Sequence, residues 1–128
     1  MAENKEYYMQ NVENGTIQIS EDVVGSIAAM AVMEVEGVCG LSPSFGTDIA
    51  DMLSSKKSLG KGIRLTAGEQ ENLTVDCNVI AKFGQSVFEL AKNVQDAVKS
   101  SLESITGLHV DKVNVNICGI ALPRETKK

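Results

Sequence analysis

A long amphipathic helix between two alternating segments is the feature that most constrains how this chain can fold. Ser86 and Glu89 have the spacing of a capping box, which starts a helix, and Gly107 supplies its end. Between them lies an apolar stripe at helical spacing, formed by Val87, Leu90, Ala91, Val94, Ala97, Val98, Leu102 and Ile105. The sequence therefore predicts a helix of about 20 residues.

The segments on both sides of this helix alternate in polarity with a period of two, as half-buried strands do. Before the helix, one face comprises Val75, Cys77, Val79, Ala81 and Phe83, and the other comprises Thr74, Asp76, Asn78, Ile80 and Lys82. After the helix, Val113, Val115 and Ile117 alternate with Lys112, Asn114 and Asn116. Strand, helix, strand is a crossover unit, which almost always makes the two strands parallel and places the helix on one face.

The first half of the chain adds a second helix and further strands. Residues 15–19 alternate like a short strand, and Ser20 is a predicted N-cap because acidic residues follow it at the positive end of the helix dipole. This helix runs for about four turns to Gly37, with an apolar face of Val23, Val24, Ile27, Ala28, Met30, Ala31 and Val35. A brief strand is expected at 38–41, and residues 63–67 form an antiparallel hairpin with the strand that begins near residue 73.

Both long helices must pack against an apolar surface, and each strand has only one apolar face. The sequence thus predicts an α+β fold: a two-layer sandwich with two long helices on one face of a mixed β-sheet. The opposite face would be polar and would present Arg64, Asp76, Asn78, Lys82, Asn114 and Asn116 to solvent or to a partner.

A single domain is expected over residues 15–122. Residues 1–14 are polar and without period, so they are interpreted as a flexible N-terminal arm in which Tyr7 and Tyr8 are the only residues suited to docking. Residues 123–128 are expected to form a flexible tail. Within the domain, residues 47–53 have a short helical pattern, and the stretch SSKKSLGKG that follows is typical of an exposed loop.

Composition limits the classes of partner and compartment. With 12 basic against 17 acidic residues the net charge is -5, which opposes non-specific attraction to nucleic acid. No run approaches the 18 or more apolar residues that span a bilayer, and the polar N-terminus does not resemble a signal peptide, so the expected location is the cytoplasm without direct membrane insertion. The three cysteines, Cys39, Cys77 and Cys118, are interpreted as buried reduced thiols.

The turn Gly84-Gln85-Ser86 resembles the nucleophile elbow of a serine hydrolase, because a strand precedes it and a helix follows. The elbow needs a second glycine two residues after the serine, and Phe88 stands there. His109 is the only histidine, and it lies beyond the far end of the helix that Ser86 begins, roughly 30 Å away at 1.5 Å per residue. No pair of residues has a recognised metal-ligand spacing, so neither catalytic residues nor a cofactor are expected.

Two features could bind an anion. The amides at the helix N-terminus near Ser86 attract anions, although Glu89 in the same turn would repel a phosphate. A basic loop containing Lys56, Lys57 and Lys61 could contact RNA or an anionic membrane surface, although it has no aromatic residues to stack on bases. Capping by Ser86 and solvation of the lysines are the simpler interpretations.

The order of these segments closely resembles the alkaline shock protein family, also called the envelope stress response family, of Gram-positive bacteria. The resemblance covers roughly residues 15–120. It depends on Gly15 with Ile17 and Ile19, Glu36-Gly37-Val38, Val75-Asp76, Phe83-Gly84, Val94-Gln95, Thr106-Gly107 and Val113-Asn114-Val115. Many relatives would have tyrosine in place of Phe83.

The resemblance implies a small cytoplasmic protein of cell-envelope or alkaline stress, without an established enzymatic activity or agreed catalytic residues. It also implies self-association, or location at the membrane through a membrane-anchored partner. We therefore expect a non-enzymatic protein of cell-envelope homeostasis that associates with itself or docks on a partner through its polar face or an exposed strand edge. The alternative is a nucleic-acid or small-anion binding module that uses Ser86 and the lysine loop.

Overall fold

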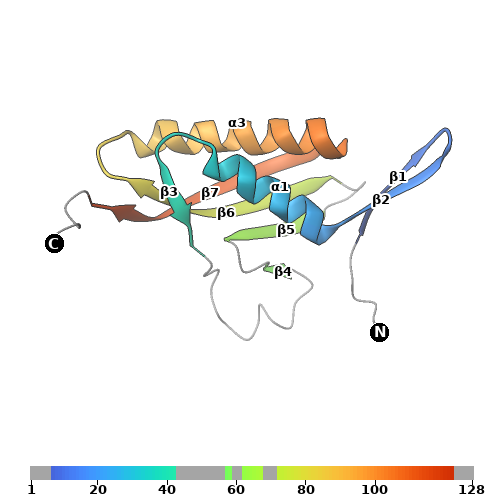
Figure 1. The fold of residues 1–128 in the computed structure, drawn as a ribbon, viewed down its shortest axis with the longest axis horizontal. Coiled ribbons are helices and arrows are strands. Elements are labelled where there is room, and N and C mark those ends of the chain that lie inside the picture. The colour runs from blue at the N-terminus through green and yellow to red at the C-terminus, as the bar shows by residue number, and fades with distance from the viewer. Residues whose placement is uncertain (1–6, 43–56, 59–61, 68–71, 123–128) are drawn as a thin grey trace.

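The computed structural model describes residues 7–42, 57–58, 62–67 and 72–122 (Figure 1). In chain order, the elements are β1 (Tyr7–Val12), β2 (Gly15–Ser20), α1 (Glu21–Met33), β3 (Val38–Leu41), β4 (Lys57–Ser58), β5 (Ile63–Ala67), β6 (Leu73–Lys82), α3 (Val87–Thr106) and β7 (Val110–Ala121). β1 and β2 form a separate hairpin, and the other strands form one mixed sheet.

β6 is the centre of the main sheet and has neighbours on both edges. β7 pairs with it in parallel along its whole length. On the other edge, β5 pairs antiparallel with residues 73–77 and β3 pairs antiparallel with residues 79–81. The predicted β5–β6 hairpin and the predicted parallel crossover through α3 are therefore confirmed, and β4 extends the sheet beyond β5.

β3 and β5 meet end to end beside Asn78 of β6. Ser42 donates its backbone N–H to the Asn78 carbonyl at 3.0 Å, and Asn78 donates its own N–H to the Gly62 carbonyl at 2.9 Å. Ser42 and Gly62 thus lie next to each other on the same edge of β6. A Cβ atom at position 62 would lie 2.7 Å from the Ser42 carbonyl oxygen, and φ there is +82°, so this junction requires glycine.

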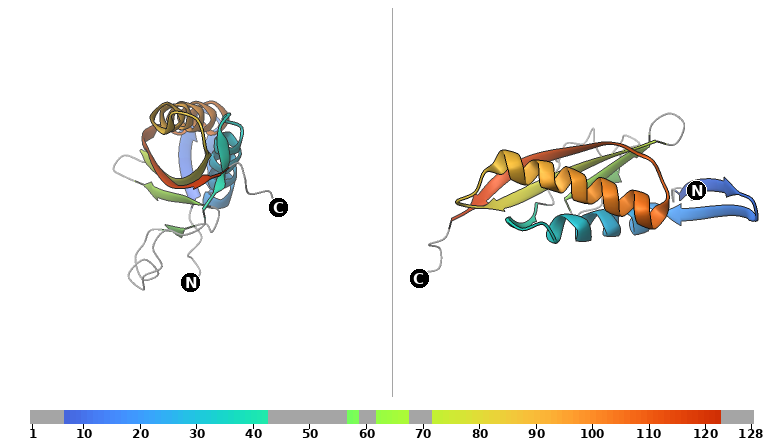
Figure 2. Two further views of the ribbon diagram at one scale, coloured as in Figure 1. Left: turned by 90° about the vertical axis from the view of Figure 1, so that its left-hand side faces the viewer. Right: turned by 90° about the horizontal axis from the view of Figure 1, so that it is seen from above.

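Both helices lie on the same side of a curved sheet (Figure 2). α1 begins after Ser20, whose Oγ accepts the Val23 N–H at 3.3 Å, and α3 ends at Gly107, which has a left-handed φ of 77°. The largest fully buried side chains lie in the core: Val24, Val32, Ile63, Leu65, Leu73, Val75, Cys77, Val79, Val94, Val98, Leu102 and Val110. The predicted α+β two-layer sandwich is confirmed.

The prediction of a flexible arm is wrong for residues 7–12. They form β1, which pairs antiparallel with β2 from Tyr7 opposite Ser20 to Val12 opposite Gly15. The base of this N-terminal hairpin is attached to the domain, because Tyr8 is only 6% exposed and Gln10 Nε2 donates to the Thr106 carbonyl at 3.0 Å. The rest of the hairpin projects away from the sheet (Figure 1). Residues 1–6 and 123–128 lie outside the described residues.

Other differences concern the ends of elements. Phe83, Val87 and Ile105 are exposed rather than part of the apolar faces, because β6 ends at Lys82 and because the buried stripe of α3 follows Leu90, Val94, Val98 and Leu102. α1 ends at Met33, one turn before Gly37. The loop predicted after residue 53 contains the strand β4, and the helix predicted at residues 47–53 lies outside the described residues.

Candidate interaction surfaces

The polar face is a ladder of bonded side chains across β5, β6 and β7. Arg64 and Asp76 are opposite in register, with the Arg64 Nε and Asp76 Oδ2 atoms 3.8 Å apart. Asn114 lies opposite Asp76 on the other edge and donates from Nδ2 to Asp76 Oδ1 at 2.9 Å. Further along, Asn116 donates in the same way to Asn78 Oδ1 at 3.0 Å. Five of the six predicted residues therefore come together, and they bind one another across the strands.

The other predicted binding residues do not join this ladder. Lys82 is exposed at the end of β6, four residues beyond Asn78, which is roughly 13 Å along a strand. Lys57 begins β4 and lies opposite Leu65 in register. Lys56 and Lys61 lie outside the described residues.

Ser86 is a helix cap, as predicted. Its Oγ accepts the Glu89 N–H at 3.2 Å, and the acidic side chain of Glu89 is in the first turn of α3. His109 follows the other end of the same helix, so the two residues cannot form a nucleophile and base within one chain. The described residues contain no group of three His, Cys, Asp or Glu that could hold a metal ion.

The sequence predicted docking through the polar face or an exposed strand edge without assigning the edge to a strand, and one such edge is the outer edge of β7, meaning the edge that faces away from β6. Within the described residues β7 pairs only with β6, so this edge of a 12-residue strand has no strand partner. Side chains of α3 bind its first part instead. Gln95 Nε2 donates to the Val113 carbonyl at 2.9 Å, and Lys99 Nζ donates to the Val110 carbonyl at 2.8 Å. Glu103 Oε2 accepts the Val110 N–H at 2.9 Å.

These three residues are spaced by four along α3, so they lie on one face of the helix. Polar residues at that spacing were the only sequence signal of the contact, and they are also typical of a solvated helix face. A groove of about 370 Å³ runs between this face and β7, lined by Gln95, Asp96, Lys99, Asp111, Lys112, Val113 and Asn114.

The carboxyl group of Glu103 is held in its charged form. The Val110 N–H bond is the largest cause of a lowered pKa, followed by the Lys99 ammonium, which donates to Glu103 Oε2 at 3.2 Å. His109 Nδ1 lies 3.5 Å from the same oxygen. The turn between α3 and β7 is thus organised around one carboxylate.

The cysteines differ in exposure. Cys77 is fully buried in the core, and burial, with a smaller effect of the Asp76 charge, raises the pKa of its thiol to about 12. Cys39 and Cys118 are exposed, so the prediction of three buried thiols is wrong for two of them. Both stand at irregularities in strand register, between Val38 and Gly40 and between Ile117 and Gly119, which the alternation pattern does not reveal.

Fold and surfaces define a small α+β scaffold whose notable features are a bonded polar face and a partly occupied strand edge. The chain belongs to the alkaline shock protein 23 family, which has a cell envelope-related function and whose sequence model matches residues 9–122. The family resemblance predicted from the sequence is confirmed.

Relatives in Gram-positive bacteria support this assignment. The uncharacterized protein Spy1614 of Streptococcus pyogenes is 32% identical over 116 residues, which cover 90% of this chain and 95% of that protein. The uncharacterized protein YqhY of Bacillus subtilis is 29% identical, over 83% of this chain and 77% of its own length. A stress response regulator gls24 homolog of S. pyogenes is 24% identical over 83% of this chain and 59% of its own length.

No solved structure is detectably similar to the chain. Among the helices that the structure describes, none is long and apolar enough to cross a membrane.

Proposed function

We propose that this protein is a non-enzymatic component of the cell-envelope stress response and acts by docking on a protein partner through the outer edge of β7. The partner is a second copy or a membrane-anchored protein, which would hold this chain at the cytoplasmic side of the envelope. The observation that supports the proposal is the strand edge itself: β7 has 12 residues and, among the described residues, a strand neighbour on one side only. Such an edge is a template for pairing with another chain.

The polar face supports docking less well. Its side chains already bind one another, from Arg64 and Asp76 to Asn114, and Asn78 is buried at 6% exposure. A partner there would have to replace internal hydrogen bonds with its own, which brings little net free energy.

In-cell crosslinking tests the proposal. Lys112 of β7 and Lys92 of α3 are expected to crosslink to a protein partner or to a second copy. Mass spectrometry identifies the linked residues. The proposal is wrong if the purified protein stays monomeric at high concentration and no crosslinked partner is recovered. A measurable turnover by the pure protein would contradict the non-enzymatic assignment.

A further inference from the structure

The outer edge of β7 has two unlike halves. In residues 110–113, the outward groups of Val110 and Val113 are bound by side chains of α3, as described above. Val110 and Val113 both point outward because the register is irregular between Val110 and Lys112. Beyond that irregularity, the backbone groups of successive strand residues point alternately to the two edges. Val115 and Ile117 therefore point outward like Val113, up to the register irregularity that follows Ile117.

The end of β7 shows independently which of its backbone groups point outward. The Ala121 carbonyl accepts the Phe83 N–H at 3.1 Å, so the backbone groups of Ala121 point toward β6 and those of Ile120 point away. In the part of the chain that the structure describes, no side chain binds the outward groups of Val115, Ile117 or Ile120. Residues 115–121 form the open half of the edge. This segment is long enough to pair with a strand of the usual length, about five to six residues.

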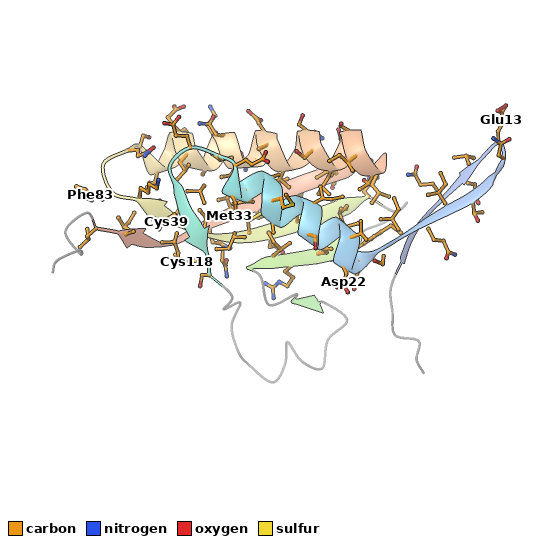
Figure 3. The ribbon with its side chains drawn as sticks, viewed as in Figure 1. Glu13, Asp22, Met33, Cys39, Phe83 and Cys118 are labelled. Atoms are coloured by element: carbon orange, nitrogen blue, oxygen red, sulfur yellow. The ribbon has the colours of Figure 1, made fainter. Side chains whose placement is uncertain are left out.

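The side chains around the open half are apolar. Phe83 is 62% exposed at the end of the molecule opposite the tip of the hairpin (Figure 3). Phe88 in the first turn of α3 is 68% exposed. Exposed Val87, Ile120 and Leu122 belong to the same end, because Phe83 is bonded to Ala121 and α3 starts four residues after Phe83. Exposed apolar residues gathered next to an unpaired edge are typical of a binding surface.

Two lysines of the described chain lie near the open half, although the whole chain carries -5. Lys92 lies one turn before Gln95 on α3, with its Nζ atom 5.5 Å from the centroid of the Phe88 ring. Lys82 ends β6, and the acidic residue in the first turn of α3 is Glu89. Edge pairing with a second copy would place like charges opposite one another, whereas an acidic chain would complement them.

We propose that the open half of β7, residues 115–121, binds an extended acidic segment of another protein as an added strand, with apolar side chains at alternate positions. The added strand would hydrogen-bond the outward groups of Val115, Ile117 and Ile120 and place its apolar side chains on Phe88 and Ile120. Its carboxylates would lie near Lys92 and Lys82. This inference rests on the proposed function and specifies the part of the edge and the partner chemistry.

Two fluorescein-labelled peptides of alternating residues test the inference on the full chain by fluorescence anisotropy. They are (Glu-Val)₄ and (Lys-Val)₄. The acidic peptide is expected to bind at least about tenfold more tightly, a difference that should shrink as salt is raised. Ile120→Pro removes an outward N–H that the β6 pairing does not use, and should weaken binding about tenfold or more.

Two helix-surface variants keep the test decisive even if Ile120→Pro unfolds the domain. Lys92→Glu and Phe88→Ala should each weaken binding of the acidic peptide, by about tenfold for the charge reversal. The matched control is Lys112→Glu, the same charge reversal beside the half that α3 already occupies, and it should change binding less than about twofold.

Several results would overturn the inference: equal binding of both peptides, Lys92→Glu and Phe88→Ala without effect, or peptide-induced amide protection at residues 110–113 in place of 115–121. A concentration-dependent dimer that protects Ile120 in the absence of peptide would assign the open half to a second copy, and would also overturn it. The proposed function would survive each of these results if crosslinking recovers a protein partner or a second copy at the outer edge of β7.

Discussion

Glu103 accepts the backbone N–H of Val110 at 2.9 Å, across the turn that joins α3 to β7. One carboxylate thereby satisfies the first outward donor of an edge strand and binds Lys99 on its own helix. Edge strands in natural proteins carry such features because an unpaired edge invites association with other chains.

The Glu103 contact predicts a specific pH dependence. Its pKa is lowered from 4.5 in the folded state, so the contact stabilises the fold above about pH 4.5, and this stabilisation is lost as pH falls through the lower folded pKa. The amide signal of Val110 in NMR spectra should therefore titrate with a midpoint below 4.5. Glu103→Gln should remove the step. A midpoint at or above the ordinary glutamate value would contradict the assignment.

The junction at Gly62 predicts a large effect of one added methyl group. Gly62→Ala should lower the free energy of unfolding by about 2–3 kcal/mol, because the new Cβ meets the Ser42 carbonyl and φ is positive. Gly40→Ala is the matched control: its Cβ would have nothing within 4 Å and its φ is ordinary, so the change should be within about 0.5 kcal/mol. Urea unfolding of the two variants gives the comparison, and equal stabilities would disprove the crowded junction.

The N-terminal hairpin is predicted to contribute to domain stability through its base alone. Tyr8→Ala should cost about 3 kcal/mol because the side chain is buried, whereas Val12→Ala, nearer the tip and exposed, should cost less than about 0.5 kcal/mol. Thermal unfolding with circular dichroism measures both. Similar values for the two variants would show that the hairpin is not attached as described.

The hairpin also shows which kind of element the sequence did not predict. α3, β6 and β7 were predictable because their periodicity and caps are local signals in the sequence. Ser86 and Gly107, the two caps of α3, are examples. β1 has no clear alternation, and it is a strand because β2 supplies its hydrogen bonds. The dipeptide Asn14-Gly15 is a hairpin signal that could have indicated the turn.

The candidate surfaces also include one feature that the sequence predicted and one that it did not. The alternation of Asp76 and Asn78, and of Asn114 and Asn116, correctly put them on one face, because side chains of a strand alternate strictly. The bonds from Gln95, Lys99 and Glu103 to β7 depend on how closely the helix lies along the strand edge. That distance is set by packing between elements, and no periodicity encodes it.

Thiol reactivity provides the last prediction. In the folded protein, iodoacetamide at about pH 8 should modify Cys39 and Cys118, which are exposed, and leave Cys77 intact. With its pKa raised to about 12 by burial, Cys77 would be a thiolate in only about one molecule in ten thousand at that pH, and its sulfur is also inaccessible. Mass spectrometry should find two labels on the native protein and three after unfolding in guanidinium. Labelling of Cys77 in the native state at the rate of the other two would mean that the core between β6 and the helices opens far more readily than its packing implies.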